Sequence, residues 1–547
     1  MAREHRETER KYEGLALPAG LEELPGVAAT RAAEPQDLDA LYYDTSDLRL
    51  LRRGITVRRR SGGGDAGWHV KLPLAADARQ EVHLPLGTGD PSEVPAEFAA
   101  RLAVFTRGAA LLPVARLRTH RVRTHLLDGK GRILAEVDED RVAARTFDLT
   151  AEPAVPARPG PGVPSPPDGA AGGGTAQIDE WTDEWTEFEV ELENGPRALL
   201  EHTDALFAAA GLARSPWPSK LAHALDRPGT GSPGTGSLGP GPAVAGEVGG
   251  RRSAGAVVTH GIRTQYERLL VLDGAVRRGE EDSIHRMRIA ARRLRSLLTA
   301  HRRLFDTRRS TPLAEGLRWL ARLLGEARDQ EVLADQLVGA LGAVPAPMRE
   351  GALRARITEH YARTYRAARQ RAIAELDGAR YFALLDDLED FAADPPLRRR
   401  ARRDARDYLA GALRRQQRRT LRRLDKAMDT GAGPGRDEAL HRARKAAKRA
   451  RYTAEDAQGA TGRTTAERLG KYAKRMKELH KVLGDQHDSV VARQALTGLG
   501  MRAGTDRRHV FAYGVLHEAH RHAADDALAR LPRLQRRAAR RKLARLR

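Results

Sequence analysis

Apolar and polar residues alternate in short stretches over residues 1–226 of the chain. Period-two alternation, bounded by turn sequences such as SGGGDAG and DGKG, is typical of strands. Helical patterns interrupt it near 93–107 and 196–211. We therefore expect an antiparallel β-barrel or tunnel with helices outside it. The predicted strands are 54–60, 67–74, 79–86, 117–127, 132–142 and 184–193.

The pattern changes to a helical period from residue 257 onward. Long Ala-, Leu- and Arg-rich stretches predict helices, and short Pro- and Gly-containing segments separate them. These separating segments are 341–347, 391–396 and 430–435. The fold class predicted for the whole chain is therefore multidomain, α+β followed by all-α.

Two Gly- and Pro-rich tracts divide the chain further. Residues 227–256 cannot pack a core and are predicted to form a linker between domains 1–226 and 257–547. The other tract, 151–174, has strand patterns on both sides and is expected to be a long loop within the first domain. Whether this loop gates a tunnel stays open.

The helical half contains an internal repeat. The segment HRMRIAARRLR (285–295) aligns without gaps to HRARKAAKRAR (441–451), which begins 156 residues later. The elements LGEARDQEVLA (324–334) and LGDQHDSVVA (483–492) follow about forty residues after the two histidines. This period is too long for a solenoid unit, so the repeat predicts two related helical bundles.

Charge is divided unevenly between the two halves. Residues 1–260 contain 30 Lys and Arg against 37 Asp and Glu, whereas residues 261–547 contain 65 against 36. An excess of this size predicts a polyanionic partner for the second half. The chain has no cysteine, which excludes disulfides and thiolate metal sites. It also has no run of about 18 apolar residues and no apolar signal segment, so we expect a cytoplasmic protein without membrane contact.

Charged residues also occur at period two in the predicted strands. Glu7, Glu9 and Lys11 share one face of the first strand. One such strand would be typical of a solvated face, but four strands with both signs favour a polar cavity. Carboxylates bind Mg²⁺ or Mn²⁺, and basic side chains neutralise phosphate oxygens. The other runs are Arg58 and Arg60; Glu136, Asp138 and Asp140; and Glu187, Glu189 and Glu191.

The segment ETERKY resembles the ExExK motif that opens the CYTH superfamily, the triphosphate tunnel metalloenzymes. Further segments are similar to that family in the same order: YYDTSDLRLLRRGITVRRR (42–60), HVKLP (69–73), RQE (79–81), EVELE (189–193) and Ser219–Lys220. The resemblance covers residues 4–226. It implies an eight-stranded tunnel that binds a triphosphate with a divalent metal. Because no aromatic cluster accompanies the motifs, we favour inorganic triphosphate over a nucleotide.

The resemblance also implies roles for individual residues. The positions matched to catalysis are Glu7, Glu9, Lys11, Arg58, Arg60 and Lys71. The positions matched to substrate binding are Arg79, Arg118, Arg121 and Lys220, with Glu81 beside them. The implied ligands of Mg²⁺ or Mn²⁺ are Glu7, Glu9, Asp138, Asp140, Glu189 and Glu191. Two choices stay open: Asp138 or Asp140, and Arg121 or Arg123 where the family pattern falls on His120.

Each copy of the helical repeat carries basic residues on one face. His285, Arg288 and Arg292, with Arg295, share an arc of roughly 80° on a helix. A basic face can simply be solvated, but exposed helices usually mix signs to form i,i+4 pairs. A stripe of one sign that recurs in a second copy favours an anion-binding surface.

The repeated pattern H-x-x-R-x-x-x-[RK]-[RK]-x-R resembles the CHAD domain, a conserved-histidine α-helical domain, over residues 257–547. The resemblance implies binding of inorganic polyphosphate and association with polyphosphate granules. The implied contacts are His285, Arg288, Arg292, Arg293, Arg295, His441, Arg444, Lys445, Lys448, Arg449 and Arg451. Arg328, Lys474, Lys477, Lys481 and His487 are further candidates.

Three classes of function follow from these features. The first is a metal-dependent inorganic triphosphatase with a polyphosphate-binding domain, and the second is a non-catalytic polyphosphate-targeting protein. The third is a nucleic-acid binder. The retained ExExK, LRxR-like and ExE motifs favour the first class over the second. Aromatic residues make up only 5% of the chain and form no stacking motif, so we expect only non-specific binding of nucleic acid.

Overall fold

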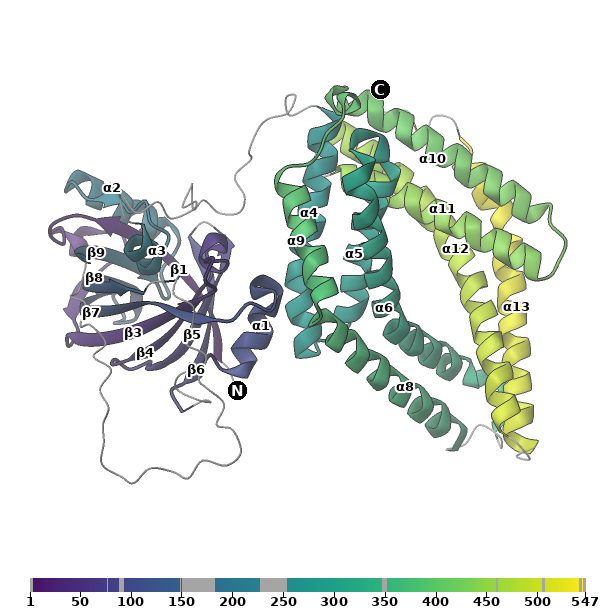
Figure 1. Ribbon diagram of the computed structural model, residues 1–547, viewed down its shortest axis with the longest axis horizontal. Helices are drawn as coiled ribbons and strands as arrows, with labels where there is room; N and C mark the ends of the chain where they lie inside the picture. Colours follow the sequence, from purple (N-terminus) through teal and green to yellow (C-terminus); the bar gives the residue numbers. More distant parts are fainter. Residues whose placement is uncertain are drawn as a thin grey trace, which may run out of the picture. The chain divides into compact units, whose positions relative to one another are not determined.

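The chain folds into two compact units, residues 1–243 and 244–547 (Figure 1). The computed structural model describes residues 3–75, 77–87, 93–147, 149, 183–226, 253–346, 352–458, 461–503, 507–540 and 544. The predicted 151–174 loop and the predicted linker up to residue 252 lie outside these described residues.

Ten antiparallel strands form the sheet of the N-terminal unit in its described residues, and eight of them close into a barrel. The barrel order is β1-β6-β5-β4-β3-β7-β8-β9, and β9 pairs back to β1, while β2 joins β7 and β10 joins β1. The strands are β1 (Arg3–Glu13), β2 (Ala29–Ala32), β3 (Gln36–Asp44), β4 (Thr56–Ser61), β5 (Gly67–Ala75), β6 (Ala78–Pro85), β7 (Leu112–Leu127), β8 (Ile133–Thr146), β9 (Asp183–Leu192) and β10 (Ala213–Arg214). The predicted antiparallel barrel is confirmed.

The apolar face of the barrel strands points outward, toward the helices. Tyr12 of β1 packs against Phe207 of α2 (Ala198–Ala209), with ring centroids 4.6 Å apart. Trp68 of β5 shares a buried cluster with Phe98 and Leu102 of α1 (Ala96–Thr106). A third helix, α3 (Lys220–Leu225), covers β7 and β8. Because successive side chains alternate between faces, the charged positions of the same strands point into the barrel.

The C-terminal unit is built of helices, as the sequence predicts. Its first bundle contains α4 (Ala254–Arg278), α5 (Ser283–Ala300), α6 (Thr307–Gly339), α8 (Ala352–Leu376) and α9 (Ala379–Ala393). Its second contains α10 (Ala405–Met428), α11 (Pro434–Gln458), α12 (Arg463–Arg502) and α13 (Arg507–Ala538). Short 3₁₀ turns complete it: η3 (Arg302–Leu304), η4 (Ala340–Ala343) and η5 (Arg399–Arg402). In the described residues, no helix combines the length and the apolar character needed to cross a bilayer.

The repeated segments occupy corresponding places in the two bundles. The basic repeats lie on α5 and α11, which contact each other, and the Leu-Gly elements lie on their neighbours α6 and α12. A Cβ atom at Gly325 of α6 would stand 3.0 Å from the guanidinium of Arg288. Gly484 of α12 lies in the same relation to Arg444, at 3.5 Å. Each glycine therefore leaves room for the arginine that stands three residues after the histidine of the adjacent repeat, which explains why the two elements recur together.

Candidate functional site

A charged cavity of about 200 Å³ lies inside the barrel. Eight Lys or Arg and eight Asp or Glu side chains line it. Cross-strand pairing sets Glu9 of β1 opposite Glu191 of β9, and Lys11 opposite Glu189. The structure brings these predicted residues to one cavity: Glu7, Glu9, Lys11, Arg58, Arg60, Lys71, Arg79, Arg121, Glu189, Glu191 and Lys220.

Glu9 lies among bases. Its carboxylate is 3.2 Å from Arg79 Nε, 3.7 Å from Lys11 Nζ and 4.0 Å from Lys71 Nζ. Burial alone would raise the pKa of Glu9, but the charges of Lys11, Lys71 and Arg79 together hold it below its usual range. Glu9 is therefore ionised at neutral pH.

Glu191 differs from its neighbour across the strand pair. Among the described residues, no hydrogen bond or ion pair reaches its carboxyl group. Burial, together with the charges of Glu7, Glu9 and Glu81, raises the pKa of Glu191 to about 8, despite the attraction of Lys71. This end of the cavity therefore holds more acid than its own bases neutralise, which favours binding of a cation.

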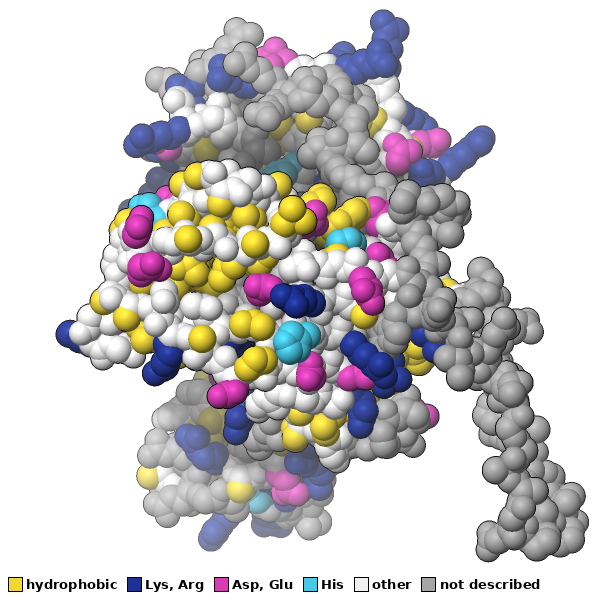
Figure 2. Space-filling view, turned by 90° about the vertical axis from the view of Figure 1, so that its left-hand side faces the viewer, with side chains coloured by type: hydrophobic (Ala, Val, Ile, Leu, Met, Phe, Trp, Pro, Cys, Tyr) yellow, Lys and Arg dark blue, Asp and Glu magenta, His cyan; other side chains and the backbone are white. Residues whose placement is uncertain are grey.

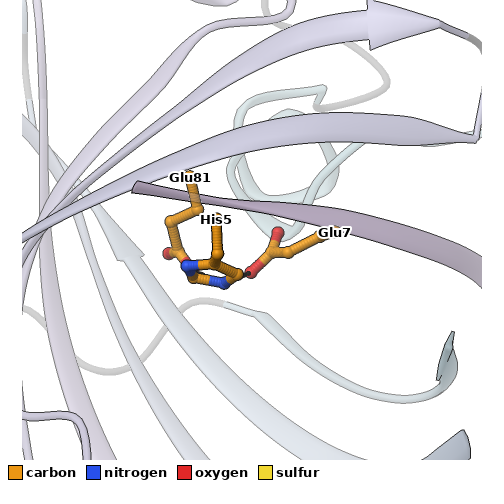
Figure 3. Close-up of side chains that lie close together, drawn as sticks. All are labelled: His5, Glu7 and Glu81. Atoms are coloured by element: carbon orange, nitrogen blue, oxygen red, sulfur yellow. Dashed lines mark ion pairs between the residues drawn. The ribbon is translucent and has the colours of Figure 1, made fainter. Parts of the chain in front are cut away.

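His5, Glu7 and Glu81 meet at the same end of the cavity (Figure 3). The imidazole Nε2 of His5 lies 3.3 Å from Glu7 Oε1 and 3.3 Å from Glu81 Oε2. One donor atom from each residue falls within 4.8 Å of the other two. The group can thus offer one nitrogen and two oxygen ligands to a metal ion. His5 was not among the predicted ligands, although it shares the strand face of Glu7.

The opposite wall of the cavity consists of arginine–aspartate pairs. Arg121 binds Asp140 through two parallel bonds of 2.7 and 2.6 Å and also reaches Asp138 at 2.6 Å. Arg123 binds Asp138 through bonds of 2.7 and 2.9 Å. Both aspartates and both arginines thus face the interior, so neither choice left open by the sequence is exclusive. These two aspartates serve here as partners of the arginines.

Lys220 closes this wall at the start of α3. Its ammonium lies 2.8 Å from Asp140, 2.7 Å from Glu187 and 2.7 Å from Glu189. The Ser219 hydroxyl caps the helix by accepting a hydrogen bond from the Ala222 amide. This cap fixes the backbone from which the Lys220 side chain extends. Glu187 was visible in the period-two run, but the family motif did not select it.

An aromatic group borders this wall. Trp185 donates a hydrogen bond of 2.8 Å to Glu187, and its ring lies 4.1 Å from that of His223. His223 in turn stacks on Trp217 at 5.7 Å. The sequence showed no such cluster, because its members lie far apart in the chain. His223 belongs to α3, and the two tryptophans pack against the apolar cluster that includes Leu221 and Ala222 of this helix.

In the helical unit, four cations form a central cluster, Arg288 and Arg292 of α5 with Arg444 and Lys448 of α11. Burial and the charges of Arg288 and Arg444 lower the pKa of Arg292 to about 10. Burial and these arginines also hold the pKa of Lys448 well below its usual range. The cluster is therefore electrostatically strained in the absence of anions. The Nε atoms of Arg288 and Arg444 are buried without a hydrogen-bond partner among the described residues.

Four histidines flank the central cluster. The rings of His441 and His487 lie 4.2 Å apart. Burial and neighbouring cations lower the pKa of His441 to about 4 and that of His480 to about 2. His285 also has a lowered pKa, because of its burial and Arg328. All of these imidazoles are neutral at neutral pH. His480 was not among the predicted residues, and only its place beside the cluster reveals it.

Acidic residues neutralise the cluster only at its edges. Arg288 binds Asp329 at 2.9 Å, and Arg444 lies 3.9 Å from Asp488. These aspartates belong to the repeated Leu-Gly elements, so the two copies repeat this contact as well. The center of the surface keeps its positive charge.

Comparison with known proteins follows the same division of the chain. The sequence model of the CYTH domain matches residues 5–224, and that of the CHAD domain matches residues 260–497. An uncharacterized protein of Mycobacterium tuberculosis, in strains CDC 1551 and H37Rv, is 35% identical over 522 residues, which cover 94% of this chain and 92% of the relative. The chain belongs to the family of CYTH–CHAD fusion proteins.

Two solved structures resemble this chain in part. PptA from Streptomyces chartreusis shares 18% identity and covers 52% of this chain and 99% of its own, with a TM-score of 0.43. The CHAD domain of the plant Ricinus communis shares 22% identity and covers 54% of this chain and 91% of its own, with a TM-score of 0.39.

One residue predicted for the CYTH cavity lies elsewhere. The side chain of Arg118 is 57% exposed and lies 3.4 Å from Asp39 on the outer face of the barrel. His120 is also exposed and pairs with Asp37. The inward positions of β7 are Arg121 and Arg123, so the predicted place of Arg118 in the cavity is wrong.

The predicted CHAD residues are divided among several environments. Arg293 and Arg451 both bind Glu455, at 2.8 and 3.2 Å. Arg295 and Arg449 line a separate cavity, whereas Lys445 is exposed. Of the further candidates, Arg328 binds Glu331 at 3.1 Å. Lys474, Lys477 and Lys481 are exposed on α12.

Proposed function

We propose that the CYTH domain is a divalent-metal-dependent triphosphatase acting on inorganic triphosphate, and that the CHAD domain binds inorganic polyphosphate. The observation that carries the first part is the charge distribution of the cavity. Eight bases and eight acids line it, yet Glu191 lies among three other glutamates without an ion pair in the described residues.

A metal ion and a triphosphate fit this distribution only together. The bases already neutralise acids of the cavity, so a bare polyanion would gain little on entering. A divalent cation on the glutamates compensates their charge and leaves Lys71 and Lys11 free to contact phosphate. Charge neutralisation and positioning are what phosphoryl transfer chiefly requires of a protein.

The residues suited to hold Mg²⁺ or Mn²⁺ are Glu7, Glu9 and Glu191, with Glu81 and His5 beside them. A bound ion would polarise a phosphoryl oxygen and neutralise charge that develops there. Carboxylate oxygens are the ligands these hard cations prefer.

Arg58 and Arg60 are suited to hold the substrate phosphates. Arg58 Nη1 contacts the Tyr42 hydroxyl at 3.4 Å, and Arg60 forms an ion pair with Asp65. The Nε atoms of both arginines are buried and lack a hydrogen-bond partner among the described residues. Guanidinium groups with spare donors bind phosphate oxygens in pairs, and the two side chains share one face of β4.

The central cluster of the CHAD domain supports the second part of the proposal. Four cations from α5 and α11 depress one another's protonation, and buried donors of Arg288 and Arg444 lack partners in the described residues. A polyanion relieves this repulsion and satisfies the donors. The sparse aromatic content gives nucleobases few stacking surfaces, which favours polyphosphate over nucleic acid.

The test is phosphate release from a panel of triphosphate, ATP, thiamine triphosphate and long-chain polyphosphate, each with Mg²⁺ or Mn²⁺. Triphosphate should be hydrolysed fastest. Glu191→Gln should lower its turnover by roughly a hundredfold or more, because a metal ligand is worth several kcal/mol. Glu184→Gln, on the exposed face of the same strand, is the matched control and should leave turnover unchanged.

Other outcomes decide between function classes. No turnover of any substrate, combined with tight polyphosphate binding, would replace the enzyme by a polyphosphate-targeting protein. Faster turnover of ATP would assign the cavity to nucleotides. Equal effects of Glu191→Gln and Glu184→Gln would remove Glu191 from the site.

A further inference from the structure

A second cavity, of about 620 Å³, lies in the CHAD domain between α5, α6, α10 and α11. Arg295 of α5 and Arg449 of α11 line it from the duplicated helices. Five other arginines come from segments outside the repeat. They are Arg302, Arg303, Arg318, Arg415 and Arg419.

The charge of this arginine cavity is almost entirely uncompensated. Glu315 is the one acidic residue among the side chains that line it. Within the described part of the chain, none of the seven arginines forms an ion pair. Burial and the charges of Arg419, Arg423 and Arg295 lower the pKa of Arg449 to about 10. The cavity therefore repels its own charges as long as no anion occupies it.

The internal repeat gives this cavity a counterpart, and the counterpart is neutralised. Residues of α5 correspond to residues of α11 that lie 156 positions later, so Arg295 corresponds to Arg451, Arg449 to Arg293, and Thr299 to Glu455. Thr299 lines the arginine cavity. At the corresponding place, Glu455 binds Arg293 at 2.8 Å and Arg451 at 3.2 Å.

An aromatic ring further closes the counterpart. Tyr452 lies beneath both arginines, with the guanidinium of Arg451 4.8 Å and that of Arg293 5.2 Å from its centroid. The equivalent residue in the first copy is Ser296, which leaves no such ring beside Arg295. The two ends of the pseudo-symmetric surface therefore differ: one is open and cationic, and the other is occupied by its own acid.

We propose that the arginine cavity is an anchoring site for condensed phosphate at one end only of the polyphosphate-binding surface, and that Glu455 blocks the equivalent site at the other end. The inference rests on the proposed polyphosphate binding of the CHAD domain. It adds a polarity to that binding, because a chain that crosses the central cluster enters a cationic cavity on one side and meets a neutralised pair on the other.

The lining of the cavity favours condensed phosphate over other polyanions. Guanidinium groups bind tetrahedral phosphates through paired hydrogen bonds. The hydroxyl groups of Thr299 and Ser310 add further donors. Tyr408 is the one aromatic residue of the lining, so stacked nucleobases find almost no partner. A closely spaced, flexible chain of charges matches seven clustered cations better than the wider spacing of a nucleic acid.

The test is the affinity of the full chain for long-chain polyphosphate at fixed salt, measured by isothermal titration. Thr299→Glu copies the second half of the repeat into the first and should weaken binding by about tenfold or more, the range for lost contacts between charged groups. Glu455→Thr copies the first half into the second and should tighten it. Each substitution makes the two ends alike at this position without altering the central cluster.

A matched pair of variants separates a site from general attraction. Arg415→Gln with Arg419→Gln should weaken binding by about tenfold or more, whereas Arg414→Gln with Arg418→Gln should change it by less than about twofold. Both pairs are exposed, lie on α10 and remove two charges, but only Arg415 and Arg419 line the cavity. Circular dichroism checks that each variant is folded.

Equal losses from the two α10 pairs, or no effect of Thr299→Glu, would overturn the inference. Competition by duplex DNA at an equal phosphate concentration would also overturn it. If the unaltered chain failed to bind polyphosphate at all, the proposed function of the CHAD domain would fail first. If it bound and the exchanged residues had no effect, only the one-sided anchor would be wrong.

Discussion

The two charged cavities of this chain differ in their balance of acidic and basic side chains. The CYTH cavity has eight bases and eight acids within about 200 Å³, and most of them form ion pairs across neighbouring strands. The cavity between the CHAD helices has seven arginines and one glutamate within about 620 Å³. On the outer face shown in Figure 2, acidic and basic side chains are interspersed.

Under the proposed functions, this difference would separate catalysis in the CYTH domain from binding without chemistry in the CHAD domain. If the CYTH cavity takes the proposed triphosphate, its balanced charge would require a cation to admit the polyanion, and occupancy would depend on metal. Under the proposed function, the unbalanced charge of the CHAD domain would attract a polyanion of suitable spacing without a metal. A small enclosed site of balanced charge suits turnover, whereas a long surface of one sign suits binding without chemistry.

Removal of divalent metal should produce the largest difference between the activities expected of the two units. In EDTA, phosphate release from triphosphate should fall by at least about a thousandfold, because several kcal/mol of charge stabilisation are lost. Polyphosphate binding should stay within about twofold at constant ionic strength. The measurements are a phosphate-release assay and isothermal titration, each with Mg²⁺ or Mn²⁺ restored afterwards.

Either of two results would contradict the expected difference between a metal-dependent CYTH cavity and a metal-independent CHAD surface. Turnover that persists in EDTA would show that the balanced cavity works without a cation. Polyphosphate binding that is lost in EDTA and regained with metal would show that the helical surface also depends on a bridging cation.

Arg58→Gln should have the next largest effect, confined to the CYTH domain. Loss of charge-assisted contacts costs about 1.5–3 kcal/mol, which corresponds to roughly tenfold to a hundredfold or more in kcat/KM. Arg118→Gln is the control, because its side chain is 57% exposed on the outer face of the barrel. It should leave kcat/KM within about twofold. Equal effects would contradict the inward and outward assignment of these arginines.

The inward face of most strands could be predicted from the sequence, because one position in two carries charge. On β7 this reasoning fails for a physical reason. Basic residues occupy both of its faces: Arg116 and Arg118 pair with Asp39 outside, whereas Arg121 and Arg123 pair with aspartates inside. Alternation alone cannot distinguish two charged faces. For this reason the prediction that Arg118 lines the cavity was wrong.

The sequence also could not predict which acidic residue forms an ion pair with which basic residue. The repeat predicted that α5 and α11 carry basic stripes, but it treated their members as equivalent. Only the packing of the helices shows that Glu455 neutralises Arg293 and Arg451 while Arg295 and Arg449 keep no such partner in the described residues. Strand register plays the same part in the barrel, where it sets Glu191 opposite Glu9.

Arg292→Gln should weaken polyphosphate binding by roughly tenfold, since it removes one member of the central cluster and its phosphate contact. The slope of log affinity against log salt should fall by about one. Phosphate release from triphosphate should be unchanged, because Arg292 lies in the other compact unit. Arg356→Gln, an exposed arginine of α8, controls for the loss of one charge. The same reduction of affinity in both variants would reduce the cluster to generic attraction.

The smallest expected effect is the pH dependence of polyphosphate affinity in the CHAD domain. His441 faces Arg292 of α5, Arg444 and Lys445 of α11 and His487 of α12, and burial with these neighbours lowers its pKa to about 4. A bound polyanion offsets the cations and raises this pKa, so by linkage the protonated domain binds more tightly. Affinity should therefore increase as the pH falls from 7.5 toward 5.5, by about threefold for a modest upward shift of the pKa.

Calorimetry at pH 5.5 in two buffers of different ionisation enthalpy should accordingly reveal proton uptake on binding. His441→Gln should reduce that uptake even where some affinity remains, which separates protonation from loss of a contact. Proton release, or an affinity that decreases toward pH 5.5, would contradict the sign of this linkage. A cationic surface would then hold its histidines neutral in the complex as well, and polyphosphate would be bound by the arginines and lysines alone.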